Sequence, residues 1–311
     1  MAVIRNQRRV RIAEGVSAMR TDRTAVVGVD GSPESLRAVE WAAADAARRQ
    51  RPLRVVYAFP RPTVYAPLTV PASSRLYEET MREGAEQILT EAVSRAVMVA
   101  PTLEISTHIA VRQPAAALVD ASRHAAVAVV GHRGLGGFTG LLLGSVGVEL
   151  AAHAACPVVI VRHADRPAGP QAGRVLVGID GSHDAEDALR FAFEQAAFRG
   201  TGLTAVHAYL WPEPANPNDV LPLVCDRDDL RDEERRALVE SITGWAERYP
   251  DVDVHRLVVR GRPAAVLTEL SAGAELLVVG SRGLGGFTGL LLGSVSQAVI
   301  QHAACPVAVV R

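Results

Sequence analysis

A glycine-rich stretch of fourteen residues, RGLGGFTGLLLGSV, occurs twice in this sequence without a difference, at 133–146 and at 282–295. Five of its residues are glycine, which is tolerated in ordered structure where the backbone adopts unusual angles or where something must approach it closely. Each copy of the stretch ends in Gly-Ser at the start of a predicted helix. The backbone N–H groups of such a loop and the positive end of a helix dipole favour an anion, most commonly phosphate.

A second motif with chemical potential is an aspartate followed by Gly-Ser, which occurs as VVGVDGS at 26–32 and as LVGIDGS at 176–182. Each motif ends an apolar run that predicts a buried strand, and the glycine stretch follows another such run. In a doubly wound sheet the first and fourth strands of each copy are expected to be neighbours. Neighbouring strands lie about 4.8 Å apart, so one small ligand can touch the motifs at the ends of both strands. We therefore expect Asp30 to face the loop at Gly131 and Asp180 to face the loop at Gly280.

Several other chemistries do not fit these residues. A Walker phosphate loop needs a lysine, and all 33 basic residues of this chain are arginine. A dinucleotide fingerprint requires GxGxxG after the first strand, where this chain has Asp-Gly-Ser. The three cysteines form no CxxC pair and the nine histidines form no HExxH motif, so we expect no zinc site. Ser182, His183 and Asp184 are consecutive at a helix start and cannot adopt the geometry of a catalytic triad.

Length and composition bound the class of protein. The chain has 311 residues, of which 49% are hydrophobic and 5% aromatic, and this suits two α/β domains with proper cores. The net charge is −1, so no overall field favours nucleic acid or a membrane surface. No apolar run approaches the roughly 18 residues of a membrane span. Residues 1–23 carry six arginines without an apolar core and predict a flexible basic leader, and the few cysteines suit the reduced thiols of a cytoplasmic protein.

The two motifs recur because the chain is a tandem duplication. The aspartate motif repeats at an offset of 150 residues, and HAACPV, which begins at 153 and at 302, repeats at an offset of 149. Between the copies lies HADRPAGPQAG, whose prolines and glycines are typical of a linker. We expect the leader at 1–23, a first domain at 24–162, the linker at 163–173 and a second domain at 174–311.

Each copy alternates short apolar runs with longer amphipathic stretches, which is the pattern of βαβ units around a parallel sheet. In the first copy we expect strands at 25–30, 53–59, 103–111, 126–131 and 158–161, and helices at 33–50, 74–99, 114–124 and 145–153. The expected fold is α/β, with two tandem doubly wound domains of five parallel strands in the order 3-2-1-4-5, of the nucleotide-binding α-hydrolase-like type. The first and fourth strands are then neighbours, and the ligand site lies beyond their carboxyl ends.

Taken together, the motifs resemble those of the tandem-domain universal stress proteins. The glycines follow G-x2-G-x9-G-S in both copies, with V-G-[VI]-D-G-S after the first strand and H-A-A-C-P-V before the last. The resemblance covers 24–162 and 174–311, which is nearly the whole chain. In that family the glycine pattern marks the members that bind ATP.

The resemblance implies two ATP sites, with Mg²⁺ as the associated ion. Asp30 and Asp180 would contact the ribose or the metal, and the backbone near Ala58 and Ala208 would meet the adenine edge. The residues implied to hold ribose and phosphates are Gly131, Gly134, Gly144 and Ser145 in the first copy, and Gly280, Gly283, Gly293 and Ser294 in the second. The binding set is completed by Gly31, Arg133, Val146, Gly181, Arg282 and Val295.

Some of these residues keep a second interpretation on sequence alone. Ser145 and Ser294 can be simple helix N-caps, and Ser294 can form a capping box with Gln297. Asp30 and Asp180 can make Asx turns with their own backbone.

Three further positions call for an expectation. His132, beside the first glycine stretch, either touches a phosphate or faces solvent. Cys156 and Cys305 precede a proline at the start of the last strand, and we expect buried packing rather than a redox switch. Arg112 stands in VRQP where the second copy has a glycine in VRGRP, so the turn after the third strand can differ between the copies.

The resemblance implies a nucleotide-binding regulator of the stress response with at most slow ATP hydrolysis. No glutamine or glutamate is placed by a motif to activate water, and the SGGxDS and HIGH signatures of related adenylating enzymes are absent from the sequence. A genuine ATPase or nucleotidyl-transfer enzyme of the same fold class is the alternative. A dimerisation scaffold that binds no nucleotide is a third interpretation, which two intact glycine loops disfavour.

The last strands of the copies, CPVVIVR and CPVAVVR, are short, apolar and hazardous if left open at a sheet edge. We expect them to pair with each other in an internal pseudo-dimer, as in the family. As partners we expect an adenine nucleotide, a second copy of the chain in a homodimer and a signalling protein, but neither nucleic acid nor a membrane.

Overall fold

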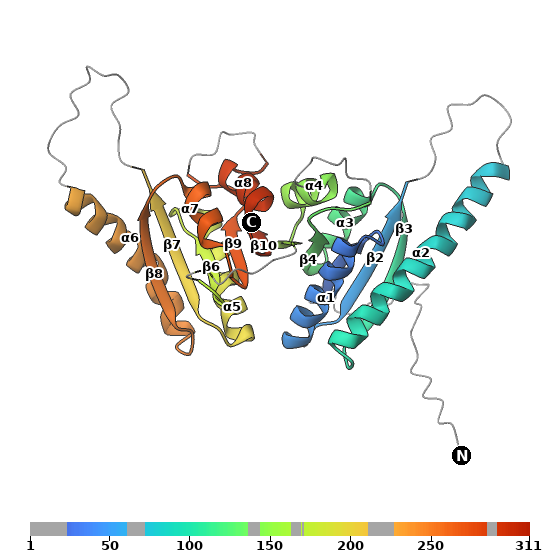
Figure 1. The fold of residues 1–311 in the computed structure, drawn as a ribbon, viewed down its shortest axis with the longest axis horizontal. Coiled ribbons are helices and arrows are strands. Elements are labelled where there is room, and N and C mark those ends of the chain that lie inside the picture. Colours follow the sequence, from blue (N-terminus) through green and yellow to red (C-terminus); the bar gives the residue numbers. More distant parts are fainter. Residues whose placement is uncertain are drawn as a thin grey trace, which may run out of the picture.

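The computed structural model describes residues 24–60, 72–135, 144–162, 169, 171–210, 227–284 and 291–311. The predicted leader and most of the predicted linker lie outside the described residues. The described strands form one sheet in the order β3-β2-β1-β4-β5-β10-β9-β6-β7-β8 (Figure 1). Within each copy this is the expected order 3-2-1-4-5, so the predicted doubly wound fold is confirmed.

The elements agree closely with the sequence pattern. The first copy contains β1 (Thr24–Val29), α1 (Pro33–Arg48), β2 (Leu53–Phe59), α2 (Ala72–Val99), β3 (Ile105–Val111), α3 (Pro114–Ser122), β4 (Ala125–Gly131), α4 (Ser145–His153) and β5 (Val158–Val161). The second contains β6 (Val175–Gly178), α5 (His183–Arg199), β7 (Leu203–Tyr209), α6 (Arg227–Arg248), β8 (Val254–Arg260), α7 (Pro263–Leu270), β9 (Leu276–Gly280), α8 (Ser294–His302) and β10 (Val307–Val310). Every boundary expected for the first copy lies within two residues of the observed one.

Helices cover both faces of the sheet. Alternate strand residues such as Val27 and Val177 pack against α1, α2, α5 and α6, while their neighbours Val26 and Leu176 pack against α3, α4, α7 and α8. Strands that are buried on both faces need continuous apolar runs, which is why the sequence lacks a clear polar alternation there. Among the described residues, no helix combines the length and apolarity that a membrane crossing requires.

The two copies are joined through the middle of the sheet. β5 and β10 run antiparallel, with Val307 opposite Ile160 and Val309 opposite Val158, whereas every other neighbouring pair of described strands is parallel. Both strands are buried along their whole length. The expected pairing of the two last strands is therefore confirmed, and it removes two apolar sheet edges.

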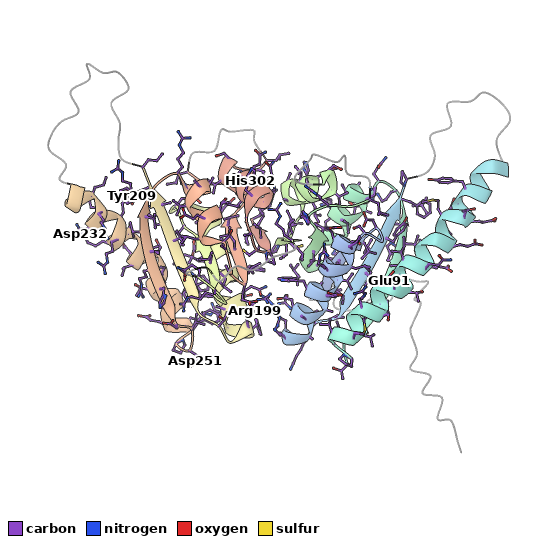
Figure 2. The ribbon with its side chains drawn as sticks, viewed as in Figure 1. Glu91, Arg199, Tyr209, Asp232, Asp251 and His302 are labelled. Atoms are coloured by element: carbon purple, nitrogen blue, oxygen red, sulfur yellow. The ribbon has the colours of Figure 1, made fainter. Side chains whose placement is uncertain are left out.

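On one face of the sheet, α1 and α5 meet through a buried polar seam. Asp45 is 2% exposed, and its Oδ1 accepts a hydrogen bond from Nη2 of Arg199 at 3.2 Å. Its Oδ2 lies 3.5 Å from Nε of Arg49. The Arg49 guanidinium lies 5.3 Å from the ring centre of Phe191, and that of Arg199, which sits between the two halves in Figure 2, lies 5.1 Å from the ring of Trp41. One carboxylate thus serves two arginines, one from each copy.

The two cysteines that the structure describes are buried, as expected. Burial raises the pKa of the Cys156 thiol from about 9 to about 12. We expect Cys156 to resist alkylation by iodoacetamide in the native protein below pH 9 and to react after unfolding in urea, with mass spectrometry locating the label. Between these two pKa values the unfolded chain loses a proton that the folded chain keeps, so this group lowers stability as pH rises above 9. Rapid native labelling of Cys156 would contradict the buried assignment.

Candidate functional site

Each copy's first strand ends in a tight turn built on its aspartate. Oδ1 of Asp30 accepts a hydrogen bond from the N–H of Ser32, and Oδ1 of Asp180 accepts one from the N–H of Ser182, both at 3.0 Å. The glycine between them has a φ of +87° in the first copy and +79° in the second. Glycine adopts such angles without steric cost, so the Asp-Gly-Ser sequence suits this turn.

The other oxygen of each aspartate reaches the glycine loop after the fourth strand of its copy. Oδ2 of Asp30 accepts a hydrogen bond from the N–H of Leu135 at 2.8 Å, and Oδ2 of Asp180 accepts one from the N–H of Leu284 at 3.0 Å. The prediction that each aspartate faces its glycine loop is confirmed. The Asx turn is present as well, because one carboxylate makes both contacts.

Two glycines in each loop are required by the protein's own packing. A Cβ added at Gly134 or Gly283 would lie 2.2 Å from the carboxylate of that copy's aspartate. A Cβ added at Gly131 or Gly280 would come within 3.0 Å of the first turn of α1 or α5. These positions let two loops and a helix start meet closely at the carboxyl end of the sheet.

The third glycine of each loop, Gly144 or Gly293, is different. Its backbone is extended, with φ near −70° in both copies (−74° and −71°), and an added Cβ would find its nearest neighbour at 3.6 or 3.4 Å. That is an ordinary van der Waals contact, so nothing in the described part of the chain requires glycine there. The bare backbone leaves the N-termini of α4 and α8 open to an approaching group.

The interpretation of Ser145 and Ser294 as N-caps is wrong. Gly144 and Gly293 occupy the cap positions, and each serine is the first residue of its helix with no side-chain capping bond. The capping box with Gln297 does not form, because Ser294 lies one residue beyond the cap. Both serines are exposed.

In the second copy the predicted residues surround a cavity of about 570 Å³. The predicted residues that line it are Asp180, Ala208, Gly280, Arg282, Gly283, Gly293, Ser294 and Val295; Gly181 does not. The sequence did not single out the apolar part of the lining, which is Ile179, Ala185, Val206, Pro263, Leu267, Val279 and Leu284. The cavity therefore combines an apolar wall with a helix N-terminus and one arginine.

The rim of the site differs between the copies. In the second copy Oδ2 of Asp184 accepts hydrogen bonds from the hydroxyl of Ser281 at 2.9 Å and from the N–H of Arg282 at 3.1 Å. In the first copy Glu34 takes the place of the aspartate and pairs with an arginine one helical turn later. His132 takes the place of the serine, so the loop loses this link to the first helix.

His132 is half-buried, so the imidazole is only partly open to solvent, and both interpretations of this residue remain predictions. Its Nδ1 is buried and has no hydrogen-bond partner among the described residues. Burial, followed by the charge of Arg162, lowers the pKa of His132 below its usual range, which favours the neutral imidazole. Ala58 and Val146, also predicted for the first site, are half-buried in β2 and in the first turn of α4.

Two arginines accompany each glycine loop. Arg133 and Arg282 are exposed, and Nε of Arg282 lies 3.6 Å from Oδ2 of Asp184. Arg162 is half-buried and Arg311 is exposed, and partial desolvation lowers the pKa of both guanidinium groups. The charge of Arg133 lowers the pKa of Arg162 further, and that of Arg282 does the same to Arg311. This repulsion between like charges favours an anion at each loop.

The turn after the third strand also differs, as expected. In the first copy Arg112 forms an ion pair with Asp120 on α3. In the second copy Gly261 stands in this turn, and a Cβ added there would lie 2.8 Å from the side chain of Val266.

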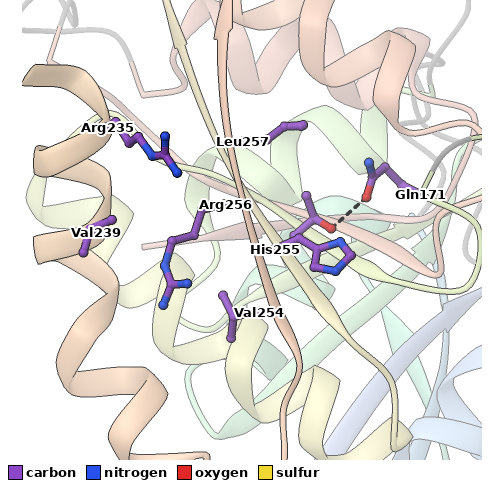
Figure 3. Close-up of a pocket in the computed structure, with 8 residues that line it drawn as sticks. Gln171, Arg235, Val239, Val254, His255, Arg256 and Leu257 are labelled. Carbon is purple, nitrogen blue, oxygen red and sulfur yellow. Dashed lines mark hydrogen bonds between the residues drawn. The ribbon is translucent and has the colours of Figure 1, made fainter. Parts of the chain in front are cut away.

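A second hollow of about 710 Å³ lies beside the edge strand β8, and no glycine-loop residue lines it (Figure 3). Arg235 and Arg256 lie on one side of the strand, and His255 lies on the other beside the hydrogen bond from the hydroxyl of Thr204 to Gln171. No carboxylate lines this hollow, and half of its lining residues belong to the exposed edge strand β8. We assign the functional site to the carboxyl ends of the strands, where ligands bind in open α/β sheets.

Fold and site together define a class: a tandem α/β protein whose two doubly wound domains each present an aspartate and a glycine loop at the strand-order reversal. The profile of the universal stress protein family matches residues 23–162 and 172–311. Universal stress protein Rv1996 of Mycobacterium tuberculosis is 41% identical over 309 residues, covering 95% of this chain and 97% of its own length. A universal stress protein of Mycolicibacterium smegmatis is 40% identical over 298 residues, covering 94% and 98%.

The chain belongs to the universal stress protein family and carries two of its domains in tandem, as the resemblance implied. The crystal structure of a universal stress protein from Archaeoglobus fulgidus has the same fold, with a TM-score of 0.67 and 22% identity. The match covers 93% of this chain and 96% of that one.

Proposed function

We propose that this protein binds ATP, together with Mg²⁺, at its two glycine loops and acts as a regulator of the stress response with at most slow hydrolysis. The observation that carries the proposal is the glycine before α4 and α8. The packing around this glycine leaves room for a Cβ, so packing does not explain why the residue is glycine. The bare backbone leaves the helix N-terminus open, and two arginines accompany each loop. Free N–H groups, a helix dipole and guanidinium groups are the donors that phosphate prefers.

The residues of the second site fit an adenine nucleotide. The apolar wall suits a base, and Ala208 at the end of β7 lies where the base edge would meet the backbone. Among the described residues no cluster of three His, Cys, Asp or Glu side chains could hold a metal. Mg²⁺ is commonly held by one or two carboxylates and by substrate phosphates, so Asp180 and the bound nucleotide would share the ion.

The position of the aspartates supports a binding protein over an ATPase. Each carboxylate already accepts backbone hydrogen bonds through both oxygens, which hold two loops together. We propose further that the protein is a cytoplasmic homodimer, and that it signals the binding of nucleotide to a partner protein. Because β5 and β10 pair within the chain, the contact between two chains would use another surface.

The test is the release of nucleotide from purified, heat-denatured protein, counted per chain. We expect two adenine nucleotides, chiefly intact ATP, or two Mg-ATP sites by titration calorimetry if the protein is isolated empty. Recovery of ADP with steady turnover would favour the ATPase. No bound nucleotide and no binding of added Mg-ATP would overturn the proposal.

A pair of variants assigns the sites. Gly134→Ala and Gly283→Ala place a methyl group against the aspartate carboxylate, and together they are expected to abolish Mg-ATP binding. Gly84→Ala in α2 is the matched control, because its added Cβ meets nothing within 4 Å. Equal binding by the double variant and the control would contradict the assignment.

A further inference from the structure

The final arginine of each copy crosses to the other copy. Arg162 follows β5, and its Nη1 and Nη2 donate to the carbonyls of Ala303 and Gln301 at 2.8 and 2.7 Å, at the C-terminal end of α8. Arg311 follows β10, and its Nη2 donates to the carbonyls of Ala151 (3.4 Å) and Ala152 in the last turn of α4. A guanidinium satisfies free carbonyls there and interacts favourably with the negative end of the helix dipole.

Arg311 makes one more contact, which connects the two sites. Its Nη2 also donates to the carbonyl of Leu291 at 2.9 Å, and Leu291 lies two residues before Gly293 in the second glycine loop. The same side chain therefore touches the loop of the second site and the C-terminal end of α4. The N-terminal end of α4, at Ser145, belongs to the first site.

The connecting element is short and rigid. α4 has nine residues and spans about 14 Å at 1.5 Å per residue. Its inner side is buried through Leu150 and Ala151. α4 and α8 lie on the same face of the sheet, on either side of the central strands (Figure 1). A helix packed in this way passes a displacement of one end to the other.

We propose that Arg311 couples the two nucleotide sites, so that occupancy of either site strengthens binding at the other. This rests on the proposed function. Phosphates bound at the second loop hold the Leu291 carbonyl in place, and this fixes the guanidinium on α4. Once α4 is fixed, its N-terminus is already positioned for phosphates at the first site, so the second nucleotide orders less of the protein. The effect is reciprocal, since coupling between two binding equilibria must be.

The charges at the second site agree with this role. Arg311 and Arg282 repel each other, and Asp184 offsets that repulsion only in part. An anion at the loop neutralises the pair and allows Arg311 to remain between the loop and the helix.

The test compares association constants for Mg-ATP by titration calorimetry of the full chain. Gly134→Ala leaves only the second site, and Gly283→Ala leaves only the first. We expect the product of the two stepwise constants of the parent to exceed the product of the two single-site constants by roughly fivefold or more. In the same set of proteins carrying Arg311→Gln, this ratio is expected to fall to about one. A merely structural role would weaken all constants and leave the ratio unchanged.

The outcomes are distinguishable. A ratio of one in the parent, with both sites binding, overturns the coupling and leaves the proposed function standing. An undiminished ratio in Arg311→Gln assigns the coupling to another route and overturns the role of Arg311. Absence of any binding by the parent overturns the proposed function and the coupling with it. If Arg311→Gln does not fold, Arg311→Lys keeps the charge but loses the forked donors, and an unchanged ratio there also contradicts the proposal.

Discussion

Asp180→Asn is expected to weaken Mg-ATP binding at the second site about ten- to a hundredfold while the protein remains folded. The asparagine oxygen can keep the turn to Ser182, but its NH₂ group would then face the N–H of Leu284, where two donors cannot bond. A hydrogen bond to a charged acceptor contributes about 1.5–3 kcal/mol, and each 1.4 kcal/mol is a factor of ten in affinity. Titration calorimetry in the Gly134→Ala background, where only this site binds, measures the effect.

Asp187→Asn on α5 is the matched control for this variant. Asp187 forms an exposed pair with Arg190, 2.9 Å apart, and takes no part in the loop. Affinity in the control is therefore expected to equal that of the parent. Unchanged affinity in Asp180→Asn would show that Mg-ATP binding at the second glycine loop does not depend on the charge of the carboxylate. Unchanged affinity with loss of ATP turnover would instead place Asp180 in a hydrolytic reaction and favour the ATPase.

The meeting of the aspartate and the glycine loop could be predicted because it depends on features with short-range signals. Apolar runs define the strands, and the alternation of strands and helices in each copy restricts the topology to few possibilities. Once the first and fourth strands are neighbours, Asp30 and Gly134 must approach each other at the carboxyl edge. The contact between them, through the N–H of Leu135, needs no further information.

The helix caps could not be predicted in the same way. Serine is a preferred N-cap and glycine is also accepted, so Gly144-Ser145 offers two adjacent candidates. Which one takes the extended cap conformation depends on the loop that leads into the helix. In the structure the N–H of Gly144 donates to the carbonyl of His132 at 2.8 Å, and this closes the loop one residue earlier.

The pairing of β5 with β10 could be predicted, but the side-chain contacts between the copies could not, because they depend on the register of the two strands. The two crossing arginines, Arg162 and Arg311, carry no local signal of their helix-end partners. Asp45 does carry one: it stands on a helix face between the buried alanines Ala42 and Ala46. A lone carboxylate on such a face predicts a buried partner, but not that the partner comes from the other copy.

Asp45→Asn is expected to lower the free energy of unfolding by about 3–5 kcal/mol, because it leaves the buried Arg199 guanidinium without its carboxylate and leaves Arg49 with only Glu194, 3.5 Å away. The side chains of Arg49 and Arg199 are 2% and 6% exposed, so water cannot replace the lost charge. The equivalent position in the second copy is the buried Gln195, whose Oε1 already accepts a hydrogen bond from Nε of Arg199 at 3.0 Å and which carries no charge to replace that of Asp45. Urea denaturation followed by far-UV circular dichroism measures the difference.

Asp187→Asn again supplies the control, since it removes a carboxylate from an exposed pair and should cost no more than about 1 kcal/mol. Asp45→Asn should also alter the unfolding of both copies, because Asp45 lies on α1 and bonds to Arg199 on α5. A loss of stability confined to the first copy would mean that the seam does not couple the folding of the two domains. A loss as small as that of the control would mean that the two arginines are satisfied without Asp45.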